Sequence, residues 1–320
     1  MIVFRNLYPN ELEKWFDFLV EEIFKSESKK FFSNHWYNDP YKDINGIFVA
    51  VDADGNFLST LRVLVRDIYI NGMKISCGGI SCVGTKEEYR GQKLSTTLVQ
   101  MSIKYMEDRN ICISYLLSGD YNEKYYNRYG YYKCPRYIKY SSINKCNNDS
   151  YDYCIRDLNI EGDIRDISDI HEKFSSKFNG SIVRSMEYWK EWIVSNTTCS
   201  CKIAYDNSGK VIAYISFQVD NNNIEILDFG CLSEYINIFD SLIEKISSDM
   251  DGDNFKVIYD MNITSSMEVE SSWEPCCFMY KLITPFLIGN LKVDSSEKLL
   301  EILKGDGDVS KLLVWAVDDF

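Results

Sequence analysis

Apolar residues in the first part of the chain recur with the spacings of a helix followed by strands. A first helix is expected after Asn10, a residue that suits the N-cap position. Its apolar positions, three or four residues apart, are Leu12, Trp15, Phe16, Leu19 and Ile23. Strand-like runs then meet at Asp54-Gly55 and again at Asn71-Gly72, dipeptides that favour tight hairpin turns. The pattern therefore predicts a helix followed by antiparallel strands.

The next region predicts a helix, a buried strand and a short aromatic helix. Residues 94–108 carry apolar side chains on one helical face. The run ICISYLLS, at 111–118, has the composition of a buried strand. The tyrosine-rich segment DYNEKYYNRYGYY follows it, and we expect its helix to end at Gly130.

A polar, turn-rich stretch at 144–153 predicts a domain boundary. Beyond it the order of hairpin, strand, helix and strand recurs, up to residue 261. We expect an α/β fold (α+β, with mixed sheets) in two tandem lobes. The predicted lobes are residues 1–145 and 150–285, and residues 286–320 are predicted to form a C-terminal helix and strand.

Composition narrows the range of partners. The chain has 320 residues, a net charge of −13 and only two histidines. Because nothing supplies a basic footprint, a nucleic-acid partner is not expected. The acidic balance either favours cationic ligands such as amines or serves solubility alone. No apolar run reaches the roughly 18 residues of a membrane helix, and the N-terminus does not resemble a signal peptide.

The 11 cysteines indicate reduced thiols, so we expect a cytoplasmic protein. Cys199 and Cys201 form a CxC pair, and Cys276 and Cys277 are adjacent. Neither spacing is that of a zinc site, so no metal site is expected.

The stretch YRGQKLSTTL, at residues 89–98, is the first candidate for chemistry. It lies between a predicted strand and the start of a predicted helix, where unpaired amides and the helix dipole attract phosphate. Arg90 adds charge, and Gly91 allows close approach of the backbone. Lys93 carries a Cβ at a crowded position, although its ammonium can also reach a phosphate. The alternative is an ordinary solvated helix start.

The longer run VGTKEEYRGQKLSTTLV resembles motif A of the GNAT superfamily of acyl-CoA-dependent N-acyltransferases. The resemblance implies that Val83 and Thr85 meet the pantetheine arm of the cofactor and that Ser118 meets a pantetheine amide. The implied pyrophosphate loop consists of Arg90, Gly91, Gln92, Lys93, Leu94 and Ser95. The sequence departs from the family pattern at Glu87, often proline, and at Lys93 and Ser95, often small residues.

A second motif follows about 35 residues later. NEKYYNRYGYY resembles the family's N-x-x-A-x-x-x-Y-x-x-x-G-F region, with Tyr126 on the tyrosine position and Gly130 on the glycine. By this resemblance, Tyr126 is the acid that protonates the leaving thiolate, a role that suits a group with a pKa near 10. Tyr125 is its nearest rival, and packing of the aromatic cluster is the structural alternative.

The whole layout resembles the Eis-like tandem acetyltransferases over roughly residues 1–285. The second lobe has no Arg-Gly loop after its strand IEILDFGCL, which implies a degenerate lobe that walls the substrate cleft. Residues 286–320 are much shorter than the sterol-carrier-like domain that often ends members of this group, and a homo-oligomer remains an open alternative. The resemblance also implies that the C-terminal carboxylate of Phe320 acts as the catalytic base. The alternative is a frayed tail.

Together these features predict an acetyltransferase that uses acetyl-CoA as co-substrate. We expect a primary amine, on a small molecule or a side chain, to attack the thioester directly in a ternary complex. Histidine is not the expected base, because His35 and His171 lie outside both motifs. Two alternatives remain: a non-catalytic acyl-CoA-binding or regulatory module with a drifted pyrophosphate loop, and an aminoacyl-tRNA-dependent peptidyltransferase. The acidity of the chain disfavours the second.

Overall fold

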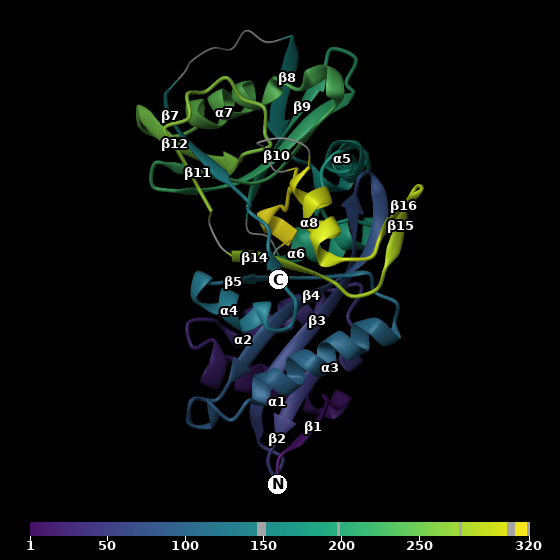
Figure 1. Ribbon diagram of the computed structural model, residues 1–320. Helices are drawn as coiled ribbons and strands as arrows, with labels where there is room; N and C mark the ends of the chain where they lie inside the picture. The colour runs from purple at the N-terminus through teal and green to yellow at the C-terminus, as the bar shows by residue number, and fades with distance from the viewer. Residues whose placement is uncertain (146–151, 197–198, 275–276, 306–310, 319–320) are drawn as a thin grey trace.

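The computed structural model describes residues 1–145, 152–196, 199–274, 277–305 and 311–318. Its strands form two seven-stranded mixed sheets and one two-stranded sheet. Figure 1 shows the two large sheets in separate lobes, one above the other, each with helices packed on it. The predicted α/β fold with mixed sheets is confirmed.

The first sheet is antiparallel except where β4 and β5 pair in parallel. Helix α3 (Leu94–Asp108) connects these two strands. The spatial order is β1 (Val3–Asn6), β2 (Ile47–Val51), β3 (Phe57–Ile70), β4 (Met73–Thr85), β5 (Ile113–Ser118), β14 (Cys277–Leu282) and β6 (Tyr132–Lys133).

The second sheet repeats this arrangement, because helix α7 (Ile238–Ser248) connects the parallel pair β11 and β12. Its other described ladders are antiparallel. The spatial order is β13 (Ser271–Trp273), β7 (Ile138–Asn144), β12 (Asn254–Asp260), β11 (Asn223–Cys231), β10 (Val211–Asp220), β9 (Ser200–Asp206) and β8 (Tyr153–Asp157).

The remaining α-helices cover the sheets or join the lobes: α1 (Leu12–Phe18), α2 (Lys29–Tyr37), α4 (Glu123–Asn127), α5 (Ile160–Ser175), α6 (Val194–Asn196) and α8 (Ser296–Lys304). The π-helical turns are η2 (Leu19–Ile23) and η6 (Tyr188–Ile193). The 3-10 turns are η1 (Pro9–Glu11), η3 (Ile44–Gly46), η4 (Glu87–Tyr89), η5 (Asp120–Asn122), η7 (Ser233–Tyr235) and η8 (Ala316–Asp318). A small hairpin joins β15 (Phe286–Ile288) to β16 (Leu291–Val293).

Several local predictions are confirmed. The strands on either side of both predicted turns pair antiparallel, and Asn71 and Gly72 have φ of 46° and 76°. A type I′ turn needs positive φ at both central residues, which explains this dipeptide. The helix over 94–108 has the predicted bounds. Asn10 as a helix N-cap is wrong, because it lies inside the turn η1.

Successive side chains of β2 point to opposite faces of the first sheet and pack in two separate layers of the hydrophobic core. Phe48 packs with Leu61, Val63 and Tyr105 on the side that α3 covers. Val49 faces the opposite side and packs with residues of α1 and α2. Successive strand side chains point to opposite faces, so this sheet is buried on both.

The sheets exchange strands across the predicted boundary near residue 145. Strand β7 belongs to the second sheet, although it precedes the boundary. Strand β14 lies in the first sheet, between β5 and β6. The division into 1–145, 150–285 and 286–320 stays a prediction, and residues 146–151 of the boundary lie outside the described part of the chain.

The segment around Ser181 contacts both the first lobe and the C-terminal segment. Ser181 donates through Oγ to the Leu313 carbonyl at 2.8 Å, and its own carbonyl accepts from the amide of Tyr69 at the end of β3. Residues 311–318 form a single bridge, between Asn179 and Leu312, and the turn η8, in place of the expected strand.

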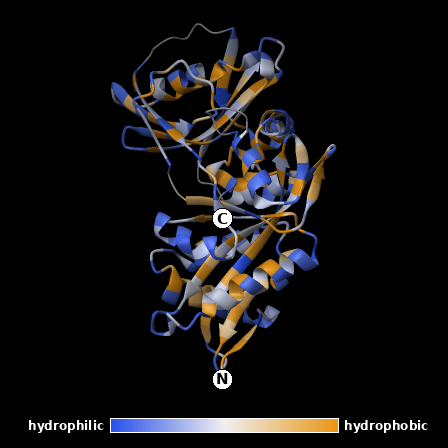
Figure 2. Ribbon diagram, viewed as in Figure 1, coloured by the Kyte–Doolittle hydropathy of each residue, from blue (hydrophilic) through white to orange (hydrophobic). Residues whose placement is uncertain are grey.

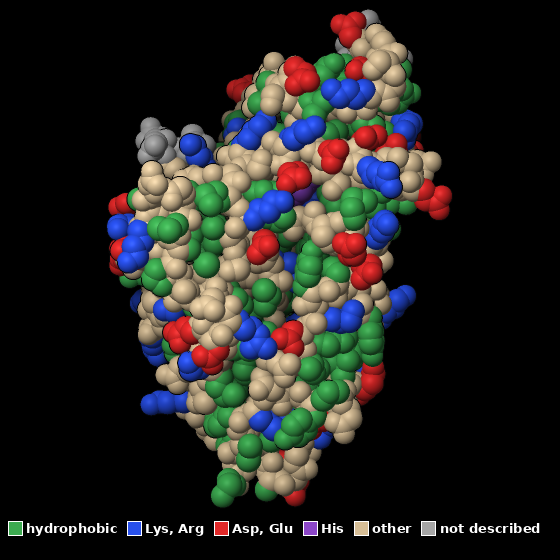
Figure 3. Space-filling model, turned by 90° about the vertical axis from the view of Figure 1, so that its right-hand side faces the viewer, with side chains coloured by type: hydrophobic (Ala, Val, Ile, Leu, Met, Phe, Trp, Pro, Cys, Tyr) green, Lys and Arg blue, Asp and Glu red, His purple; other side chains and the backbone are tan. Residues whose placement is uncertain are grey.

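Apolar residues gather in the strands and on the inner faces of the helices (Figure 2). On the face drawn in Figure 3, basic and acidic side chains are interspersed. Among the described residues, no helix is long and apolar enough to cross a membrane.

Candidate active site

Strands β4 and β5 diverge and leave an open wedge in the first sheet. Their parallel ladder runs from the pair Cys77–Ile113 to the pair Ile80–Leu116. Beyond it β4 pairs only with β3, and β5 pairs only with β14, among the described residues. The facing edges therefore offer backbone N–H and C=O groups to an extended ligand with amides of its own.

A β-bulge shapes β4 beside this wedge. Arg62 pairs with Ser81, and Thr60 pairs with Gly84, so Cys82 and Val83 oppose the single residue Leu61. Cys82 adopts a φ of 52°, in the left-handed region that a side chain rarely occupies. A bulge re-aims the backbone, and it is common next to active sites. Val83 and Thr85, the predicted pantetheine contacts, lie on this part of β4.

The predicted pyrophosphate loop lies at the N-terminus of α3. Arg90, Gly91, Gln92 and Lys93 are all exposed, and Arg90 Nε donates to the Thr85 carbonyl at 3.4 Å. The first amides of a 15-residue helix are unpaired within it, so this end attracts anions. The structure therefore brings the predicted loop to the end of β4.

Gly91 and Lys93 both have left-handed backbones, with φ of 79° and 62°. Lys93 is the N-cap of α3, and its side chain makes no capping hydrogen bond. It thus holds the conformation that glycine adopts most easily.

Of the three remaining predicted cofactor contacts, Ser95 and Ser118 flank the wedge. Ser95 lies in the first turn of α3, and its Oγ accepts a hydrogen bond from the Tyr125 hydroxyl at 3.0 Å. Ser118 ends β5, and its Oγ donates to the Gly119 carbonyl at 3.2 Å. Leu94 is buried beneath the loop, so its side chain belongs to the core.

Tyr126 is on α4, which follows β5 after one 3-10 turn. It packs in the same cluster as Leu98 of α3 and Leu116 of β5, with 7% of its surface exposed. Burial raises the pKa of the Tyr126 phenol above its usual value, so it stays protonated at neutral pH. Among the described residues, no hydrogen-bond partner holds its hydroxyl.

Tyr125, the rival acid, is engaged differently. Its ring meets that of Tyr126 edge-on at 5.0 Å, and its hydroxyl is committed to Ser95. Burial raises the pKa of Tyr125 to about 12. Both tyrosines are therefore protonated and can act as acids. The Tyr125 hydroxyl already donates to Ser95, whereas the Tyr126 hydroxyl has no such partner among the described residues.

A cavity of about 230 Å³ lies on the side of the sheet that α1 and α2 cover. Motif reasoning missed it, because its wall comes from five separate segments. It reaches the bulge of β4 at Ser81 and Cys82, and one second-lobe residue, Trp192, also lines it. The other lining residues are Trp15, Phe24, Glu27, Phe31, Phe32, His35, Arg62 and Leu64.

A buried ion cluster supports one wall of this cavity. Asp39 accepts from Arg62 at 2.7 Å and from Arg66 at 2.9 Å, and all three side chains are almost fully buried. The Arg62 guanidinium lies 5.0 Å from the centre of the Trp36 ring. Arg62 is thus held in place by Asp39 and stacked on an aromatic ring.

His35, which lies outside both motifs, lines the cavity from α2. Its Nδ1 lies 2.7 Å from the Phe31 carbonyl, so Nδ1 carries the proton and Nε2 is an acceptor in the neutral ring. Burial lowers the pKa of His35 below 6.5, which keeps the ring neutral at pH 7.

The C-terminal tail approaches the same region. The Val317 carbonyl accepts from Trp192 Nε1 at 3.2 Å, and Asp318 pairs with Arg184 at 2.7 Å. Trp192 also lines the cavity. Phe320, the predicted base, lies outside the described residues.

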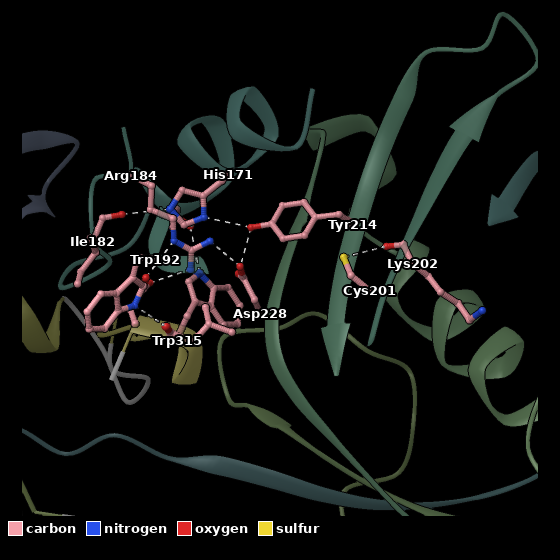
Figure 4. A network of polar contacts seen from close by, with 12 residues as sticks. His171, Ile182, Arg184, Trp192, Cys201, Lys202, Tyr214, Asp228 and Trp315 are labelled. Atoms are coloured by element: carbon pink, nitrogen blue, oxygen red, sulfur yellow. Dashed lines mark hydrogen bonds and ion pairs between the residues drawn. The ribbon is translucent and has the colours of Figure 1, made fainter. Parts of the chain in front are cut away.

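Asp318 belongs to a buried network within the second lobe. Arg184 also binds Asp228 of β11, which accepts from the Tyr214 hydroxyl at 3.0 Å. His171 donates through Nε2 to the Ile182 carbonyl at 3.1 Å (Figure 4). These contacts fix the end of the tail against the second lobe.

Comparison with known proteins finds a similarity for the first lobe. Residues 3–134 match the family model of an acetyltransferase (GNAT) domain. No curated protein sequence matches the chain.

Solved structures share the fold over both lobes. A probable N-acyltransferase from Enterococcus faecalis is 15% identical, with a TM-score of 0.71, covering 89% of this chain and 73% of that one. Eis1 from Mycobacterium abscessus is 13% identical, with a TM-score of 0.62 and coverage of 88% and 74%. Saccharomyces cerevisiae N-myristoyltransferase with bound myristoyl-CoA is 12% identical, with a TM-score of 0.55 and coverage of 80% and 72%.

Proposed function

We propose that the GNAT acetyltransferase domain at residues 3–134 makes this chain an acetyl-CoA-dependent N-acetyltransferase that acts on a primary amine. The observation that carries the proposal is the wedge between β4 and β5, which opens beside the exposed N-terminus of α3. A single ligand that carries an extended arm and a diphosphate fits both features. The arm suits the wedge, and the diphosphate suits the helix N-terminus.

In this proposal acetyl-CoA runs from the loop to the bulge. Arg90 and the amides at Gly91–Ser95 hold the pyrophosphate, and the pantetheine arm pairs with β4 at Val83–Thr85. The thioester then lies near the bulge, and the cavity lined by Cys82 and Trp192 takes the amine from the other side of the sheet.

The amine nitrogen attacks the thioester carbonyl, forming a C–N bond as the C–S bond breaks. The backbone near Val83 stabilises the developing oxyanion, and Tyr126 gives its proton to the departing thiolate. Burial raises the pKa of the Cys82 thiol, which keeps it neutral. A neutral thiol is a poor nucleophile, and this favours direct attack over an acyl-cysteine intermediate.

A base must take the proton of the ammonium. The carboxylate of Phe320 is the proposed base, and the anchoring of Val317 and Asp318 near the cavity supports it. His35 is a second candidate, since its Nε2 is an acceptor in the cavity wall.

The second lobe is proposed to be a degenerate GNAT-like unit. It repeats the parallel pair and connecting helix of the first sheet, but the segment after β11, LSEYIN, has no Arg-Gly loop. Its contribution to the site is structural, through Trp192.

The test combines binding with turnover. A thermal shift with acetyl-CoA measures cofactor binding, and release of free thiol with a panel of primary amines measures transfer. Thiol release that depends on the amine supports the transferase. Stabilisation without thiol release from any amine supports the alternative, a non-catalytic acyl-CoA-binding module. Myristoyl-CoA in the same assays tests the preference for acetyl-CoA.

A further inference from the structure

We propose that the cavity beside the β4 bulge selects a small arylalkylamine, a primary amine on a short chain that ends in an aromatic ring. This inference rests on the proposed function, because it names the acceptor of that reaction.

Aromatic rings form most of the cavity wall. Phe31 and Phe32 meet edge-on at 5.1 Å, and Phe24 tilts against Phe32 at 5.4 Å. His35 meets Trp192 edge-on at 5.1 Å. Edge-on and tilted rings present both faces and edges to a guest, which an aromatic guest can match in offset or T-shaped contacts.

The charges of the wall disfavour a guest with several cationic groups. Glu27 is the single acidic residue that lines the cavity, and it is exposed. The wall also holds the cationic Arg62, whose partner Asp39 is already shared with Arg66. A polyamine would bring further ammonium groups into the cavity without counter-charges, and burying an unpaired charge is costly.

The cavity wall has few polar groups, and most of them already form hydrogen bonds within the protein. Trp15 Nε1 donates to Thr60 Oγ1 at 2.7 Å, and His35 Nδ1 donates to a backbone carbonyl. A sugar with many hydroxyl groups needs partners for each hydroxyl that it buries, so an aminoglycoside is a poor guest. One amine can instead reach Glu27 or the acceptor Nε2 of His35.

The size of the cavity agrees with a small guest. Its volume of about 230 Å³ falls below the roughly 300–1,000 Å³ of pockets that hold drug-sized ligands. One aromatic ring with a two-carbon amine chain is therefore a better match than a guest of drug size.

Phe31 is the residue to change, because it lines the cavity and 41% of its surface is exposed. Its loss should leave the fold intact. Tyr37 provides the matched control: it lies on the same helix, is 54% exposed and does not line the cavity. Isothermal titration of phenethylamine, spermidine and kanamycin into the full chain, with CoA present, measures affinity independently of turnover.

We expect phenethylamine to bind tightest, and Phe31→Ala to weaken its binding about tenfold, as loss of a ring contact predicts. Phe31→Tyr and Tyr37→Ala should bind it like the wild type. Tighter binding of spermidine or kanamycin, or equal effects of Phe31→Ala and Tyr37→Ala, overturns the inference.

Thiol release from acetyl-CoA, measured with the same amines, separates this inference from the proposed function. Release with spermidine but not with phenethylamine overturns the arylalkylamine assignment and leaves the transferase standing. No release with any amine overturns the transfer reaction itself and, with it, the role of the cavity as its acceptor site.

Discussion

Lys93 combines a left-handed backbone with an exposed side chain at the entrance to the phosphate loop. A non-glycine residue in that conformation costs about 1–2 kcal/mol. Arg90 Nε donates to the Thr85 carbonyl and so ties this loop to the end of β4. The exposed Lys93 side chain adds an ammonium beside the N-terminus of α3.

We expect Lys93→Gly and Lys93→Ala to weaken acetyl-CoA binding by similar factors, because both remove the ammonium. The loss should shrink at high salt, since an exposed charge is screened. Titration calorimetry at two salt concentrations measures this. Tighter binding by Lys93→Gly alone would show that the lysine obstructs the loop.

Tyr126→Phe is expected to lower turnover at least about tenfold, with little change in acetyl-CoA affinity, because it removes only the acid. Steady-state thiol release and cofactor titration measure the two effects. Tyr125→Phe is the matched comparison, since its hydroxyl is bonded to Ser95. Equal turnover of Tyr126→Phe and the wild type would end the assignment.

Deletion or amidation at Phe320 is expected to lower turnover without loss of acetyl-CoA binding, because it removes the proposed base. His35→Gln keeps a polar side chain and serves as the comparison. If deletion leaves turnover unchanged while His35→Gln reduces it, the base is the histidine.

Sequence reasoning at the residue scale located the loop but not the cavity. Arg90, Gly91 and Tyr126 lie in contiguous motifs, and each motif forms a local structure around a strand end. The cavity joins Phe31, Cys82 and Trp192, which are far apart in sequence and show no pattern of their own. Only the packing of the second lobe against the first brings these residues together.

At the scale of elements, the contact between β4 and the turn η2 sets the position of the cavity wall. A Cβ placed on Gly84 would collide with the Ile23 side chain. Because Ile23 is branched at Cβ, it can give way only by moving its turn. Gly84 therefore lets η2 lie directly on the strand beside the bulge.

Gly84→Ala is expected to destabilise the chain by about 1–3 kcal/mol, the usual range for overpacking a core. The double variant with Ile23→Ala should recover part of that loss, and urea unfolding of both singles and the double measures the coupling. Additive effects of the two changes would show that the glycine and the isoleucine do not meet.

Element boundaries were predictable where one face of an element is apolar. The helix over 94–108 has such a face, and its bounds are confirmed. The first helix differs, because a π-turn at η2 interrupts its spacing after Phe18. Local periodicity cannot foresee that break, which depends on how the turn packs against β4.

At the scale of the whole molecule, the buried network of Figure 4 links the C-terminal tail to the second lobe. Two of its members, His171 and Asp228, make the stability of the fold depend on pH. Burial lowers the pKa of His171 well below 6.5, so only the unfolded chain gains its proton as the pH falls below 6.5. Burial raises the pKa of Asp228 from 3.8 to about 6, so the folded chain gains that proton first. The two effects on stability oppose each other between about pH 6 and pH 4.

Replacing His171 removes its contribution to the pH dependence of stability and leaves that of Asp228. Relative to the wild type, His171→Gln is expected to gain stability as the pH falls below 6.5, by at most about 1.4 kcal/mol per pH unit. Urea unfolding of both chains at pH 5, 6 and 7 measures the difference. A difference that does not change with pH would show that the buried histidine titrates normally.

The exchange of β7 and β14 between the sheets has a consequence for biosynthesis. A nascent chain that has emerged only as far as residue 145 holds β5 with an open edge, because its neighbour β14 begins at Cys277. Exposed strand edges recruit other strands, so a truncated first lobe would aggregate. The first sheet is thus completed only after most of the second lobe has been made.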